Sequence, residues 1–102
     1  MKNFGYVLAT KMLIDHKRKV RFMYREKSKG NDSGWRFFCG DEDQKYTDNP
    51  DNIAIYNVQT ILNIDKSILP YLNAAPGTAL ERENETDAFR ISAEFDFNAG
   101  KV

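Results

Sequence analysis

The sequence is poor in the residues that most catalytic and metal sites use. It has one cysteine, Cys39, and one histidine, His16, among 102 residues. A lone cysteine cannot form an internal disulfide, and a hydrolytic triad needs a nucleophile held beside a base. His16 falls in a basic turn, and Cys39 falls in a predicted strand, where a free cysteine acts as a small hydrophobic residue. We therefore predict a protein without enzymatic activity, without a metal site and without a cofactor.

Long apolar runs and a net charge are also missing. No stretch reaches the roughly 20 apolar residues of a membrane span, and the N-terminus lacks a signal-peptide pattern, so we expect a cytoplasmic protein without a membrane partner. The formal net charge is zero, but residues 1–30 hold nine Lys and Arg against two acids, and residues 31–102 hold six against thirteen. Much of the basic charge alternates along a predicted strand, where it is expected to form the solvated face. Nucleic acid is therefore not an expected partner.

The chain does have the composition of an ordinary small globular domain. Hydrophobic residues make up 41% and charged residues 29%, which argues against disorder. A chain of 102 residues is near the usual domain size and can bury a core without cross-links. We predict a single domain over residues 1–102.

Alternating patterns predict most of the strands. Alternation or short apolar runs between turn formers occur at residues 4–9, 20–25, 35–39, 53–55, 78–83 and 89–97. The second and third of these form a predicted hairpin, and the last two form a closing hairpin. The residues of the last strand that are predicted to face the core are Phe89, Ile91, Ala93, Phe95 and Phe97.

Helical periodicity is confined to the middle of the chain. Val58 and Ile61 lie at helical spacing behind Asn57, a residue type that is favoured as an N-cap. Asp65 interrupts the apolar stripe, and Pro70 cannot donate a backbone hydrogen bond within a helix, so we predict two short helices that meet near Asp65. The predicted fold class is α+β, a mostly antiparallel sheet with one or two short helices packed on one face.

The segment from Gly40 to Asn52 is strongly acidic. Its five acids are Asp41, Glu42, Asp43, Asp48 and Asp51, and Lys45 is its one basic residue. We expect a loop here, and structureless loops of about 12 residues are often functional. The spacing lacks the alternating acids and closing Glu of an EF-hand. Two interpretations stay open, a partner-binding surface or acids that cap turns and helix ends. The alternative function, a small enzyme or a ligand- or metal-binding domain, would use the same segment.

Trp35 and Arg36 are the other candidate binding residues. Tryptophan and arginine are frequent in binding hot spots, but a core tryptophan next to an arginine paired with an acid fits the same pattern. The alternation places the two side chains on opposite faces of a strand and does not decide between these interpretations. The hypothetical partner-binding residues are Trp35, Arg36, Asp41, Glu42, Asp43, Asp48, Asp51 and Tyr56.

Several segments taken together resemble a known bacterial family. They lie at residues 22–26, 32–38, 40–43, 48–53, 55–56 and 76–77. In combination they are similar to immunity-protein family 33, first described as a domain of unknown function and then classed with the predicted immunity proteins of polymorphic toxin systems. The resemblance covers residues 5–83 and does not include residues 84–102.

This resemblance implies an α+β fold, no enzymatic activity and a role in neutralising a toxin made by the same or a neighbouring cell. The partner it implies is a toxin protein domain that the chain binds directly. It gives neither the identity of the toxin nor the contact residues, and the oligomeric state is also left open.

Overall fold

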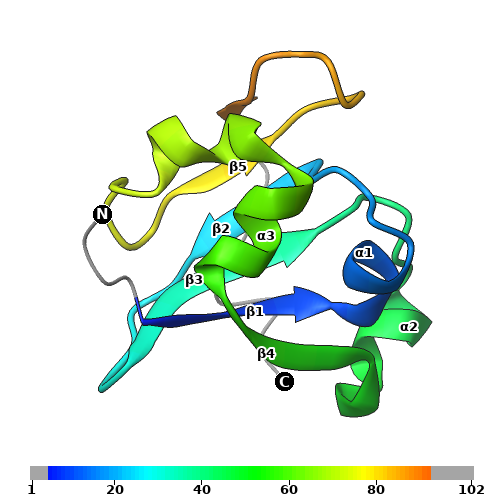
Figure 1. Ribbon diagram of the computed structural model, residues 1–102, viewed down its shortest axis with the longest axis horizontal. Helices are drawn as coiled ribbons and strands as arrows, with labels where there is room; N and C mark the ends of the chain where they lie inside the picture. Colours follow the sequence, from blue (N-terminus) through cyan, green and yellow to red (C-terminus); the bar gives the residue numbers. More distant parts are fainter. Residues whose placement is uncertain (1–4, 93–102) are drawn as a thin grey trace.

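The computed structural model describes residues 5–92. Its strands are β1 (Tyr6–Thr10), β2 (Phe22–Arg25), β3 (Asp32–Phe38), β4 (Ile53–Asn57), β5 (Ala79–Glu81) and β6 (Arg90–Ile91). They form one sheet in the order β4-β1-β3-β2-β5-β6 (Figure 1). The helices are α1 (Lys11–Asp15), α2 (Gln44–Asp48) and α3 (Val58–Ile64), with 3-10 turns at η1 (Pro50–Asn52) and η2 (Lys66–Tyr71). No helix within this range is long and apolar enough to cross a bilayer.

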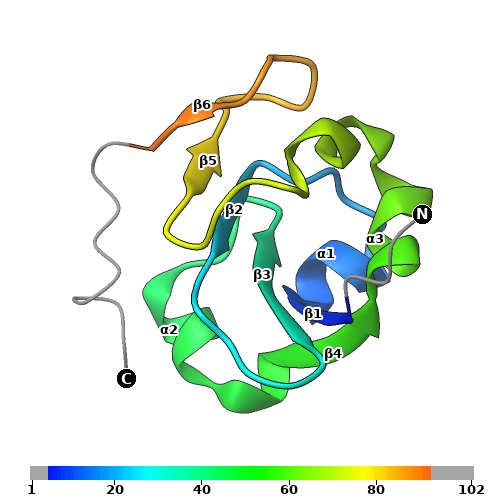
Figure 2. The ribbon, with the colours of Figure 1, turned by 90° about the vertical axis from the view of Figure 1, so that its left-hand side faces the viewer.

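The α+β class is confirmed, but the details of the sheet correct the prediction. The sheet is mixed, because β1 and β3 pair in parallel, whereas the other neighbouring strands of the sheet pair antiparallel. Helices also lie on both sides: Figure 2 shows α1 and α3 on one side of the sheet and α2 on the other. Alternation identifies strands and hairpins, but it carries no information on the direction of strands that meet without being joined by a turn.

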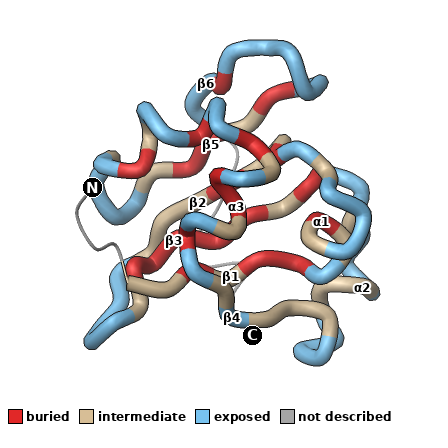
Figure 3. Tube along the Cα trace, in the orientation of Figure 1, coloured by how far each residue is buried: buried red, intermediate tan, exposed pale blue. Residues whose placement is uncertain are grey.

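The core lies between the sheet and the α3–η2 segment. Trp35, Phe37 and Cys39 alternate along β3 and its end, and all three are fully buried. Most of β3 is buried (Figure 3), so Trp35 has the core position that the alternation alone left open. Met23 of β2 faces the same core. The expected solvated basic face of β2 is therefore wrong, because Arg25 shares the side of Met23 and its guanidinium lies 5.8 Å from the Trp35 ring centroid.

Two side-chain caps organise the middle of the chain. Asn57 caps α3 by accepting from the Gln59 amide at 2.8 Å. Asp65 ends α3 and caps η2, which confirms the prediction of two short helices that meet at this residue. The predicted loop over residues 40–52 is wrong, because it contains α2 and η1.

The closing hairpin forms, but only part of its predicted inner face is buried. β5 and β6 pair antiparallel, with Leu80 opposite Ile91. Phe89 is buried, whereas Ile91 is 68% exposed, so its predicted core position is wrong. The reason is that β6 is the end strand, where a side chain can point to the core side of the sheet and still lack cover. Ala93, Phe95 and Phe97 lie outside the described residues.

Candidate functional site

The acidic segment is held in place by side-chain caps rather than being a free loop. Asp43 caps α2, accepting from the Tyr46 amide at 2.7 Å. Asn49 caps η1 by accepting from the Asp51 amide at 3.0 Å. The Tyr46 hydroxyl in turn accepts from the Met12 amide of α1 at 2.9 Å. The two caps order α2 and η1 locally, and the Tyr46 hydrogen bond ties α2 to α1.

Glu42 turns inward and joins two strands. Its carboxylate accepts from the amides of Cys39 and Gly40, each at 2.9 Å, and from the Thr10 hydroxyl at the end of β1. Burial raises the pKa of the Cys39 thiol, and the neighbouring Glu42 adds to the shift. A thiol with a raised pKa holds less of the reactive thiolate at neutral pH, so Cys39 fits the role of a small core residue.

Replacing Glu42 by alanine is expected to lower the free energy of unfolding by about 1.5–3 kcal/mol, because a charged acceptor is removed from three donors. The matched change Asp48→Ala, at an exposed position on α2, should alter stability by less than about 0.5 kcal/mol. Urea denaturation of both variants measures the difference. Equal stability losses would contradict the linking role assigned to Glu42.

The remaining acids point outward. Asp41, Asp43, Asp48 and Asp51 are exposed, and we call these four residues the acidic surface. Asp41 forms an ion pair with Arg18 at 2.5 Å, and its hydrogen bond and charge raise the pKa of that guanidinium. Asp48 accepts from the Gln44 amide side chain at 2.7 Å on the same helix. Both interpretations from the sequence thus have a place here, since Asp43 is a cap and is also exposed.

Trp35 and Arg36 belong to the framework of the fold. Trp35 is fully buried, and its indole N–H donates to the Leu72 carbonyl at 3.0 Å. Arg36 is 9% exposed and bridges Glu26 at 2.7 Å and Asp32 at 2.8 Å. Burial alone would lower the pKa of Arg36, but its hydrogen bonds to the two carboxylates raise it overall, and the Arg36 guanidinium lowers the pKa of Asp32. The core tryptophan and the paired arginine are the alternatives that the structure supports.

Tyr56 lies on β4, next to the acidic surface in the chain. Its side chain is half-buried, and burial raises the pKa of its hydroxyl, with further contributions from Asp15 and Tyr46. The Tyr56 ring is one of the partly buried side chains that pack against the core. Of the two aromatic residues in the predicted set, Trp35 is fully buried and Tyr56 is the one that remains partly exposed.

A buried ion pair was missed by sequence reasoning. Arg82 and Asp65 meet at 2.7 Å, and their side chains are only 2% and 4% exposed. The available signal was an acid that interrupts the apolar stripe before η2, together with an arginine next to a strand. Neither position indicates the other, because they lie 17 residues apart and pair through the tertiary fold.

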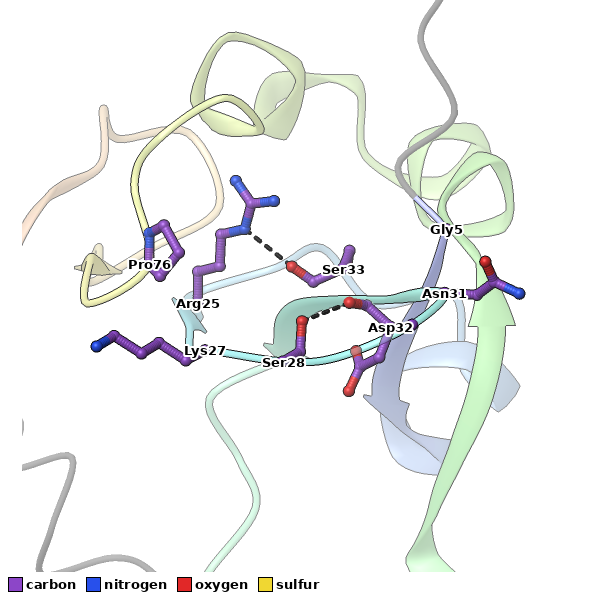
Figure 4. Close-up of a pocket in the computed structure, with 9 residues that line it drawn as sticks. Gly5, Arg25, Lys27, Ser28, Asn31, Asp32, Ser33 and Pro76 are labelled. Carbon is purple, nitrogen blue, oxygen red and sulfur yellow. Dashed lines mark hydrogen bonds between the residues drawn. The ribbon is translucent and has the colours of Figure 1, made fainter.

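A polar hollow of about 520 Å³ lies at the β2–β3 hairpin (Figure 4). Its polar groups already bind one another: Arg25 donates to the Ser33 carbonyl at 2.9 Å, and the Ser28 hydroxyl donates to the Asp32 carbonyl. None of its described lining residues is a histidine or a cysteine. No group of three or more potential metal ligands gathers within residues 5–92.

Comparison with known proteins identifies a family. A family model described as the immunity protein Imm33 domain matches residues 7–92, which is nearly the whole described range. No curated protein and no solved structure matches the chain.

Proposed function

Because this chain belongs to the immunity protein Imm33 domain family, we propose that it acts without catalysis, by binding a toxin domain directly and blocking it. The family match over residues 7–92 carries this proposal. It is supported by an outward-facing set of carboxylates held on short capped helices, because a rigid surface loses less entropy when it binds. In this proposal each copy of the chain binds and blocks one toxin domain, so inhibition is stoichiometric rather than catalytic.

The acidic surface is the proposed contact region. Asp43, Asp48 and Asp51 are exposed, and Lys45 is the one basic residue in the segment from Gly40 to Asn52. A toxin that acts on nucleic acid has a cationic cleft, which carboxylates can occupy in place of phosphates. Opposite charges of this kind speed encounter and fix the register of the two proteins. Tyr56 is the proposed aromatic contact at the margin.

Trp35, Arg36 and Glu42 enter the proposal as supports rather than contacts. Trp35 is fully buried, Arg36 is held between two carboxylates, and Glu42 binds the backbone behind the surface. The Asp41 carboxylate is paired with the Arg18 guanidinium, so Asp41 contributes less to the negative electrostatic potential of the acidic surface. The acids expected to matter most to the partner are therefore Asp48 and Asp51, which are exposed and cap no helix in the structure.

The double change Asp48→Asn and Asp51→Asn is expected to slow association with the toxin domain by about tenfold or more at low salt, and to flatten the salt dependence of the association rate. The physical reason is loss of electrostatic steering, so the dissociation rate should change less. Stopped-flow or surface-plasmon measurements at several salt concentrations give both rates, with the toxin domain first identified by its neutralisation on co-expression.

A matched control removes the same charge elsewhere. Glu83→Gln with Asp87→Asn makes the same change in net charge at exposed positions of the β5–β6 turn. This control should associate nearly as fast as the parent. If both doubles slow association equally, only the overall charge matters, and if the Asp48/Asp51 double binds like the parent, the contact surface lies elsewhere.

A further inference from the structure

We propose that two copies of this chain pair through the outer edge of β4, antiparallel and about a two-fold axis, so that their sheets become continuous. The inference goes beyond toxin binding, because it concerns the chain with itself, although the strand that it uses also carries Tyr56, the proposed aromatic toxin contact. It rests on the position of β4, on its composition and on the symmetry of the pairing.

β4 stands at one end of the sheet (Figure 1). It pairs with β1 over five consecutive residues, Ile53–Asn57, with no shift in register. Within the described part of the chain, β1 is the only strand that neighbours β4, and no strand pairs with the outer edge of β4. A regular end strand presents a row of backbone N–H and C=O groups that can pair with another strand.

The edge lacks the charges, prolines and bulges that commonly protect sheet edges against such pairing. Natural sheets protect their edges with charges, prolines, bulges or very short strands. β4 contains no charged residue and no proline, and the Ile55 side chain is 62% exposed. At the other end of the sheet, β6 spans two residues and bears Arg90, which forms an ion pair with Glu81. The difference between the two ends identifies β4 as the edge suited to a partner strand.

The chemistry of the edge fits a second copy of the chain. In an antiparallel pair related by a two-fold axis, one residue faces its own copy, and only Ile55 in that position lets all five residues pair. Ile53 then faces Asn57 of the second copy, and Ala54 faces Tyr56, so no like charges meet. The nearest acid, Asp51, falls outside the paired strands. The net charge of zero means that two copies do not repel one another overall.

Sedimentation equilibrium of the full chain tests the pairing. The parent is expected to show a concentration-dependent dimer, and Ile55→Lys should weaken its association by about a hundredfold or more, because two lysines then face each other across the axis. Ile91→Lys is the matched control, since Ile91 is equally exposed at the opposite end of the sheet, and it should dimerise like the parent. Circular dichroism checks that both variants fold.

A cross-linking test does not depend on the lysine variants. With a short bis-maleimide, Ile55→Cys should give a covalent dimer, while Ile91→Cys and the parent, whose Cys39 is buried, should not. A parent that stays monomeric at its highest soluble concentration would overturn the proposal. So would a dimer that Ile55→Lys leaves intact, or a monomer whose toxin complex is weakened by Ile55→Lys, since the edge would then serve the toxin rather than a second copy.

Discussion

Replacing Asp65 by alanine is expected to lower the free energy of unfolding by about 3–5 kcal/mol, because it leaves the charge of Arg82 buried without its partner. Both side chains are almost fully buried, and their charged atoms are 2.7 Å apart. Asp65 also accepts from the amides of Val20 at 2.9 Å and Ser67 at 3.0 Å. Arg82 donates to the Val20 carbonyl at 2.9 Å and lies 4.2 Å from the Phe89 ring centroid. One substitution therefore disturbs the entry to β2, the start of η2 and the closing hairpin.

Urea denaturation followed by circular dichroism measures this loss. The matched change Glu83→Ala removes an exposed acid from the same β5–β6 region and should cost less than about 0.5 kcal/mol. A loss below about 1 kcal/mol for Asp65→Ala would show that the ion pair is not held in solution as the structure has it.

The same pair makes stability depend on pH in a defined direction. Burial tends to raise the pKa of Asp65, but its hydrogen bonds to Ser67 and Val20 and the charge of Arg82 lower it overall. In the unfolded chain the carboxyl has its ordinary pKa of about 3.9, so the unfolded state binds more protons between the two values. The contribution of Asp65 is therefore fully present above about pH 4 and is lost as the pH falls through the lower folded value. Asp65→Ala should lose less stability than the parent over that range.

Replacing Trp35 by alanine is expected to lower the free energy of unfolding by about 3–5 kcal/mol, as for other large aromatic residues removed from a core. Trp35 is fully buried and stacks on Phe37, with ring centroids 5.9 Å apart. The Arg25 guanidinium lies over the Trp35 ring, 5.8 Å from its centroid, and the indole N–H donates to the Leu72 carbonyl. Because Trp35 is the only tryptophan, the variant must be followed by circular dichroism.

A control distinguishes a core position from a binding hot spot. Leu69 is 50% exposed on η2, and Leu69→Ala should cost far less than Trp35→Ala. If Trp35→Ala instead keeps the stability of the parent and loses only toxin binding, the tryptophan is a contact residue, and its buried position in the structure is contradicted.

The sequence predicted those parts of the fold that depend on local chemistry. The alternation of Trp35, Phe37 and Cys39 and the N-cap at Asn57 are properties of one strand and one helix end, and the structure has both. The direction of β1 relative to β3 depends on how distant segments meet, which local patterns do not record. For the same reason, the period of the last strand gave Ile91 a side of the sheet but could not supply neighbours to cover it.

The candidate site shows the same division. The composition identified the acids of residues 40–52, but not which of them turn inward. Glu42 does so because the amides of Cys39 and Gly40 are free to donate where β3 ends. Asp43 caps α2 because a helix begins at Gln44, and the cluster of acids concealed that N-cap signal. Asp48 and Asp51 remain exposed, and they are the residues on which the proposed contact depends.

A titration of toxin activity against added chain is the most direct test of stoichiometric inhibition. The concentration of the toxin domain is held well above the dissociation constant of its complex with the chain. Residual toxin activity is then expected to fall in a straight line and reach zero at one equivalent of chain. Toxin recovered from the complex after denaturation and refolding should be chemically unchanged and active again. Protection by a small fraction of an equivalent, or recovery of a covalently altered toxin, would show catalysis and would contradict inhibition by binding.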